Sequence, residues 1–146
     1  MAPADSNVRK LPEPAAPQYR VAPQNIDAEQ ALLGAILINN EAYYRVSDFL
    51  LPEHFQEGIH QNIYHLASTL IRAGKVANPI TLKTHLPDEV KIGELTTSQY
   101  LARLAAEATT IINAEDYGRT LYDLALRRKL IEVGETVVNT AYDTPV

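Results

Sequence analysis

Residues 113–142 read NAEDYGRTLYDLALRRKLIEVGETVVNTAY, and this stretch decides the fold. It contains no proline, and its first residue, Asn113, is well suited to cap a helix. Glu115 and Asp116 then place negative charge at the positive end of the helix dipole. The sequence therefore predicts one helix from Asn113 to about Tyr142, far longer than the mean globular helix of about 11–12 residues.

Two rows of apolar side chains run along this predicted helix. The first row lies in the first half and consists of Tyr117, Leu121, Leu124 and Ala125. The second lies mostly in the second half and consists of Leu126, Leu130, Val133, Val137 and Ala141. A single small domain can cover the first row, but the second row extends beyond it. The second row therefore predicts that another helix packs there, either a further segment of the protein or a second subunit.

The chain between Pro23 and this helix has helical periodicity almost throughout. Helices are predicted over about 25–38, 41–50, 57–73 and 96–108, and a short segment at 80–86 is either one or two helical turns or extended. Gly34 indicates a close approach between helices, and Gly74 is placed to end the third helix. The predicted fold is all-α: a compact bundle of about six helices with a long protruding C-terminal helix.

Residues 1–22 are predicted to form a disordered, proline-rich arm, and residues 23–146 the folded domain. Five of the nine prolines occur in the first 23 residues, and proline propagates neither helix nor sheet. The arm carries three basic and two acidic residues, so its net charge is +1. Since the whole chain has a net charge of −5, the folded domain has a net charge of −6. We interpret the arm as a floppy terminus, with a docking peptide as the alternative.

The composition excludes several classes of protein. The chain has no cysteine, which excludes a disulfide framework, a thiolate metal site and a thiol nucleophile. The net charge of −5 disfavours broad binding to the phosphate backbone, which depends on clustered lysine and arginine. The first ten residues do not resemble a signal peptide, and no apolar stretch approaches the roughly 18 residues of a membrane span. These features predict a soluble, cytoplasmic protein.

The motifs of the chain predict no catalytic, cofactor or metal site. His60 and His65 are five residues apart, whereas a helical metal pair needs a spacing of four. The Gly-Lys pair at Gly74 lacks the earlier glycine and the following serine or threonine of a phosphate-binding loop. We interpret the four histidines as solvated or core-edge side chains.

Arg127, Arg128 and Lys129 form the only basic run of the chain. On a helix these three residues span roughly 200°, so they cannot all point at one ligand. We interpret them as a solvated girdle whose aliphatic stems cover apolar neighbours. The alternative is contact with an acidic partner surface or with nucleic acid.

Five segments of the chain together carry a resemblance to a known family. They are PQNIDAEQALLGAIL at 23–37, HFQEGIHQNIYHLASTLIRAGK at 54–75, PITLKTHL at 79–86, YLARL at 100–104 and the long stretch at 113–143. In this order and spacing they resemble the N-terminal domain of the DnaB-type bacterial replicative DNA helicase, over about residues 21–143. The chain departs from that family at Asn78, where aspartate is usual, and at Gly93, where a glycine pair is usual.

The resemblance implies that the long helix is half of a helical hairpin. It also implies a hexameric motor that unwinds DNA with ATP, in bacterial cytoplasm at nucleoid-associated replication forks. The domain would form a dimer-based collar with other helicase subunits and dock primase, and a helicase loader is a further implied partner. ATP and Mg²⁺ would bind only to a separate motor domain. This chain is therefore predicted not to be an enzyme and to hold no cofactor.

The residues predicted to contact a partner are Arg128, Ile131 and Val137 on the long helix, with Tyr100 and Asp27 as further candidates. Arg128 would pair with an acidic group, and the two apolar residues would act as anchors. The alternative function is a stand-alone helical DNA-binding or regulatory module, which would need a basic helix face. The acidic balance favours a protein partner, so we expect neither strong direct DNA binding nor membrane binding.

Overall fold

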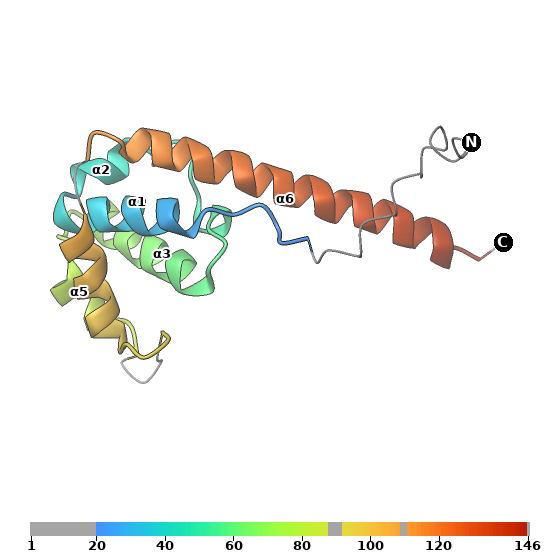
Figure 1. The fold of residues 1–146 in the computed structure, drawn as a ribbon. Helices are drawn as coiled ribbons and strands as arrows, with labels where there is room; N and C mark the ends of the chain where they lie inside the picture. The colour runs from blue at the N-terminus through green and yellow to red at the C-terminus, as the bar shows by residue number, and fades with distance from the viewer. Residues whose placement is uncertain (1–19, 88–91, 109–110, 146) are drawn as a thin grey trace, which may run out of the picture.

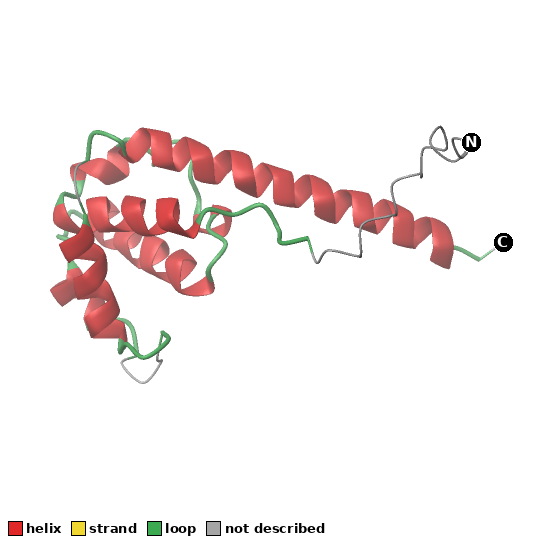
Figure 2. Ribbon diagram, in the orientation of Figure 1, coloured by secondary structure: helices red, strands yellow, loops and turns green. Residues whose placement is uncertain are grey.

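The computed structural model describes residues 20–87, 92–108 and 111–145. Figure 1 shows a helical body from which the last helix projects, and Figure 2 shows that the described residues consist of helices and connecting loops. The elements in chain order are α1 (Ile26–Ile38), α2 (Glu41–Tyr44), a 3₁₀ turn η2 (Pro52–His54), α3 (Gly58–Arg72), α4 (Pro79–Lys83), α5 (Thr97–Glu107) and α6 (Ala114–Asp143). The all-α prediction is confirmed.

Side-chain caps fix where the helices begin, as the sequence predicts. Asn25 accepts a hydrogen bond from the backbone N–H of Ala28 at 2.9 Å, which satisfies one of the free donors of α1. Thr96 and Gln99 form a reciprocal capping box at α5. Asn78 caps α4 through the N–H of Thr81 at 2.9 Å, so it supplies the same acceptor as the aspartate usual in the resembled family.

Gly74 ends α3 with a φ of +74°, a left-handed conformation that favours glycine. The third helix therefore stops where the sequence predicts. Of the two alternatives for the short segment at 80–86, the helical one is correct for its first part, which belongs to α4. Within the described residues, no helix is both long enough and apolar enough to cross a membrane.

Two local predictions are wrong. The helix predicted over 41–50 ends at Tyr44 and continues as turns, because Arg45 and Val46 bond to carbonyls only three residues back. Asn113 stands at the capping position of α6, but its side chain makes no capping bond. Its backbone (φ −90°, ψ 4°) is not in the extended region from which a side chain reaches the first free N–H groups.

The core of the body lies around α1. Eight of the thirteen residues of this helix are buried, because other elements cover it on several sides. Figure 1 shows α3, α5 and the first half of α6 against it. The largest fully buried apolar side chains of the body are Tyr43, Tyr64, Phe55, Leu32, Leu33, Ile36, Leu50, Ile63, Leu82, Leu101 and Leu121.

Two glycines allow helices to approach closely, and they set how α5 and α6 sit on the body. A Cβ atom on Gly34 of α1 would collide with the backbone carbonyl oxygen of Leu104 in α5. A Cβ atom on Gly118 of α6 would lie 2.5 Å from a methyl carbon of Val46. The close approach predicted from Gly34 is confirmed.

We expect Gly34→Ala to destabilise the protein by about 1–3 kcal/mol, since the clash is with backbone and α5 must shift. Gly134→Ala is the matched control, because nothing lies within 4 Å of its added Cβ. Alanine there should stabilise α6 by up to about 1 kcal/mol. Urea unfolding followed by circular dichroism measures both. Equal effects of the two substitutions would contradict a close α1–α5 crossing.

Candidate partner-docking site

The second half of α6 is exposed on every side. All residues from Lys129 to Pro145 are exposed, and Figure 1 shows this part of α6 projecting away from the body. We call residues 129–143 the distal segment. Its large apolar side chains include Ile131, 47% exposed, and Val137, 62% exposed; the others are Leu130, Val133, Val138 and Tyr142. The second apolar row of the sequence therefore lacks cover within the described residues.

The apolar side chains of the distal segment form a band wider than one row. At about 100° per residue, Val133, Val137 and Leu130 lie on one side, and Val138, Ile131 and Tyr142 continue around the helix. Gly134 and Ala141 lie between the two groups. The band covers about half of the helix circumference, whereas a helix that packs against a single neighbour usually presents a narrower stripe. This width suits contact with two neighbouring helices.

The charges of the distal segment lie on its other half. They are acidic beyond Lys129: Glu132, Glu135 and Asp143 follow, and no lysine or arginine occurs from residue 130 onward. Lys129 itself lies 3.4 Å from the carboxylate of Glu132. The surface therefore combines exposed apolar side chains with acidic neighbours.

Arg128 is the last residue of α6 that the body partly buries. It follows Ala114, Gly118, Leu121 and Ala125 along the side of the helix that faces the body. One guanidinium nitrogen donates to the carbonyl of Pro23 at 2.7 Å, and the other donates to the carbonyl of His54 at 2.9 Å. Arg128 thereby ties α6 to the start of the chain and to η2, at the point where the helix leaves the body.

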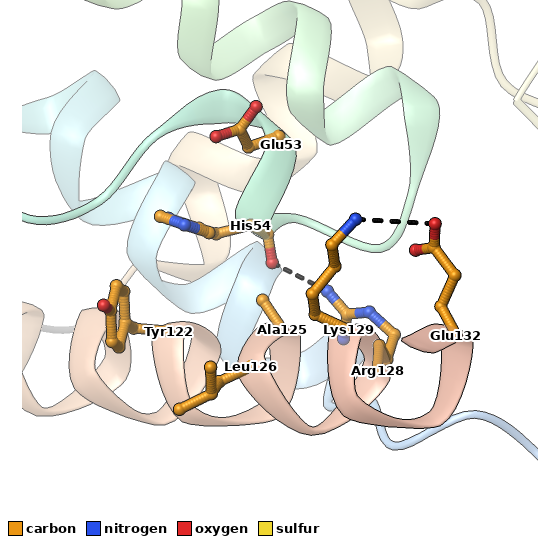
Figure 3. A pocket seen from close by; sticks show the side chains of 8 residues that line it. All are labelled: Glu53, His54, Tyr122, Ala125, Leu126, Arg128, Lys129 and Glu132. Atoms are coloured by element: carbon orange, nitrogen blue, oxygen red, sulfur yellow. Dashed lines mark hydrogen bonds and ion pairs between the residues drawn. The ribbon is translucent and has the colours of Figure 1, made fainter. Parts of the chain in front are cut away.

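A groove of about 480 Å³ lies between η2 and α6, beside Arg128 (Figure 3). Its walls carry both signs of charge, with Glu53 and Glu132 on one hand and Arg128 and Lys129 on the other. His54 forms part of the wall, and its ring packs edge-on against Tyr122 with ring centres 5.0 Å apart. The mixed charge gives this groove no clear preference for an anionic or a cationic ligand.

The pKa of His54 is lowered in this groove. Burial lowers its pKa below the ordinary value, and Arg128 lowers it further, while Glu53 opposes both effects. Its Nδ1 atom accepts a hydrogen bond from the backbone N–H of Leu51 at 2.9 Å, as a neutral ring can. This histidine therefore supports η2.

The basic run presents no continuous basic face. Arg127 pairs with Asp123 at 3.2 Å, Lys129 pairs with Glu132, and Arg128 is held by two carbonyls. The solvated-girdle interpretation fits Arg127 and Lys129. For Arg128 it is wrong, because a polar contact with the protein's own backbone holds the side chain.

The five residues predicted to contact a partner lie in three places. Ile131 and Val137 lie together on the distal segment, and Arg128 lies at its root. Asp27 is exposed on α1 and lines a small groove of about 200 Å³ between α1 and α5. Tyr100 is only 7% exposed, and its hydroxyl points inward to Gln30 and His60. A single partner surface does not bring all five together.

Sequence reasoning missed a buried polar cluster beneath Tyr100. Glu29 and His60 are almost fully buried, and Nδ1 of His60 lies 2.7 Å from the carboxylate of Glu29. Nε2 of His60 contacts the hydroxyl of Tyr100. The interpretation of every histidine as solvated or core-edge is therefore wrong for His60. A signal was present, because His60 shares a helix face with the buried Ile63 and Tyr64.

We expect Arg128→Gln to lower the free energy of unfolding by about 1–3 kcal/mol, since two charge-assisted hydrogen bonds are lost. Arg127→Gln is the matched control, because its pair with Asp123 is exposed and should contribute less than about 1 kcal/mol. Urea unfolding of the two variants tests this. If Arg127→Gln is the more destabilised variant, the clamp assigned to Arg128 does not support the fold.

Comparison with known proteins agrees with this architecture. Residues 21–123 match the family model described as the DnaB-like helicase N terminal domain. The chain is 46% identical over 140 residues to the replicative DNA helicase DnaB of Rickettsia felis. The matched region covers 96% of this chain but only 28% of that protein. The chain therefore spans a little over a quarter of the length of this relative.

Two solved structures have the same fold. The N-terminal domain of DnaB helicase from Mycobacterium tuberculosis superposes with a TM-score of 0.76 at 31% identity, covering 84% of this chain and 87% of that one. A DnaB-like replicative helicase, whose structure was described with its interactions with primase, superposes with a TM-score of 0.64 at 28% identity, covering 83% of this chain and 29% of that one. The match to the family model spans most of the sequence, and the chain belongs to the DnaB-like helicase N-terminal domain family.

Proposed function

We propose that this chain is the collar and primase-docking domain of a replicative DNA helicase. The observation that carries the proposal is the half-circumference apolar band on the distal segment, which no other described part of the chain covers. Such a surface costs solubility unless a partner covers it. Membership of the family supports a role in helicase assembly for this partner contact.

The width of the band supports two neighbours for the distal segment. One would be a following helix that folds back as the second half of a hairpin. The other would come from a second subunit, as in a dimer-based collar. Four helices packed in this way bury apolar faces on two sides of each helix. Gly134 and Ala141, in the middle of the band, let neighbouring backbones approach closely.

Primase is the proposed partner outside the collar. Ile131, towards the edge of the band, would supply the apolar anchor for primase, while Val137 would anchor the contact within the collar. The acidic residues of the distal segment would attract basic groups at the rim. Asp27 would contribute directly through the α1–α5 groove, and Tyr100 indirectly, by holding Gln30 in the wall of that groove. Arg128 would contribute by fixing the orientation of the distal segment. A helicase loader is a further proposed partner.

The full protein would unwind DNA with ATP and Mg²⁺ bound in a separate motor domain, at replication forks associated with the nucleoid. The domain described here would supply assembly and docking rather than chemistry. Its function would then depend on the orientation of α6, which the Arg128 clamp sets.

We expect the protein to associate in a concentration-dependent way through the distal segment. Val137→Ser removes an exposed apolar side chain and should weaken association about tenfold, equivalent to about 1.4 kcal/mol, with no loss of folding stability. Ile80→Ser is the matched control, because Ile80 is 69% exposed but lies on α4. Sedimentation velocity over a concentration series measures the dissociation constants. A protein that stays monomeric throughout, or an equal effect of the control, contradicts the proposed dimer contact.

Calorimetric titration with the primase of the same organism tests docking. Ile131→Ala should weaken binding about tenfold or more, since an apolar anchor is truncated. Ile80→Ala, at an exposed apolar position on α4, is the control and should bind like the wild type. Unchanged binding by Ile131→Ala would remove this residue from the site. The alternative, a DNA-binding module, predicts a mobility shift with duplex DNA at low salt, which we expect to be absent.

A further inference from the structure

A row of four polar side chains crosses the body from its core to its surface. Glu29 and Gln30 belong to α1, His60 to the first turn of α3 and Tyr100 to α5. The Glu29 and His60 side chains are about 1% exposed, and Tyr100 is 7% exposed. Hydrogen bonds link them in the order Glu29, His60, Tyr100, Gln30. The row joins α1 to α3 and α5, both of which pack against it (Figure 1).

The contacts of Glu29 fix the direction of the hydrogen bonds. Its carboxylate accepts the backbone N–H of Gln56 at 2.7 Å and that of Glu57 at 3.3 Å, just before α3. Glu29 therefore acts as an acceptor, and Nδ1 of His60 carries the hydrogen that it donates to the carboxylate. Nε2 of the neutral ring then accepts the hydroxyl hydrogen of Tyr100, whose oxygen accepts from the amide nitrogen of Gln30 at 3.2 Å. In this state each of the three hydrogen bonds of the row pairs one donor with one acceptor.

A proton taken from solvent by His60 reverses the outer half of this row. Nε2 becomes a donor, so the oxygen of Tyr100 must accept from His60 and its own hydrogen needs a new acceptor. The amide nitrogen of Gln30 cannot serve as an acceptor. A half-turn of the Gln30 amide brings its oxygen to the place of the nitrogen and satisfies the hydroxyl. The charged ring stays beside the carboxylate of Glu29.

Gln30 also lies at the surface. Together with Asp27, Ala31, Leu104 and Glu107 it lines the groove of about 200 Å³ between α1 and α5. We propose that the row is a proton-driven switch, in which the charge state of the buried His60 sets which end of the Gln30 amide faces this groove. At higher pH the amide nitrogen bonds inward to Tyr100, and at lower pH the amide oxygen does.

The charged groups around the row are compatible with such a switch. Glu29 faces His60 from α1, and Glu57 precedes α3 with its N–H on Glu29. Tyr100 faces His60 from α5, and Arg103 of α5 acts on Tyr100 electrostatically. Burial raises the pKa of Tyr100, so its hydroxyl keeps its hydrogen through the range in which histidine titrates. The proposal therefore assigns the change of charge to the imidazole of His60.

Nuclear magnetic resonance of the whole chain tests the switch. The ring nitrogens of His60 and the side-chain amide of Gln30 are followed between about pH 5 and 8. The neutral ring should show the hydrogen on Nδ1, and the Gln30 amide signals should shift with the same midpoint as His60. A folded protein in which His60 does not titrate, or in which Gln30 does not follow it, overturns the proposal.

Two variants separate the switch from a merely structural contact. His60→Gln cannot take up a proton, so the Gln30 signals should lose their pH dependence in this range. Tyr100→Phe keeps the ring but removes the relay atom, so His60 should still titrate while Gln30 no longer follows. Tyr122→Phe, on α6 away from the row, is the control and should keep the wild-type coupling. Coupling that survives Tyr100→Phe contradicts the proposal, and coupling lost in both Tyr100→Phe and His60→Gln supports it.

Discussion

The carboxylate of Glu29 is the constraint on which the body depends. A buried charge costs several kcal/mol unless donors surround it. Glu29 obtains its donors from two backbone N–H groups just before α3 and from His60 within it. The amino end of α3 thereby gains an acceptor that its own sequence does not supply, since Glu57 makes no side-chain capping bond. One side chain of α1 thus stabilises the start of α3 and, through His60, fixes the place of α5.

The long helix divides into two parts with opposite roles. Its first half belongs to the body, where Gly118 lets α6 come close to Val46 and Arg119 stacks over Phe49 at 3.9 Å from the ring centre. Its second half contributes nothing to the core, and its apolar side chains face solvent. The apolar side of α6 changes direction along the helix, so the apolar band of the second half does not continue the face that packs on the body. Arg128 marks the boundary between the part of α6 that packs on the body and the part that is exposed.

The sequence predicts well what depends on neighbouring residues and poorly what depends on distant ones. The caps of α1 and α5 join residues three apart, and the end of α3 needs only Gly74, so these features were predictable. The uncovered row of α6 was predictable from its periodicity. The Arg128 clamp joins residues 105 and 74 positions apart, and no local pattern indicates it. Glu29 left a detectable signal, because it lies at helical spacing with the buried residues Leu32, Leu33 and Ile36. A charged residue on the buried face of a helix indicates a buried polar partner, which here is His60.

The position of the Arg128 clamp makes α6 a lever. Fifteen residues follow the pivot, which at 1.5 Å per residue is an arm of about 22 Å. A change of about 5° in the angle at Arg128 would move the far end of α6 by about 2 Å, enough to misalign apolar side chains that must interlock. Two short hydrogen bonds at the root of the helix thus set the accuracy with which any assembly can be built on its tip. A small change in the angle of α6 at the body becomes a large displacement at its far end. The clamp lies at the point where fixing that angle limits the displacement most.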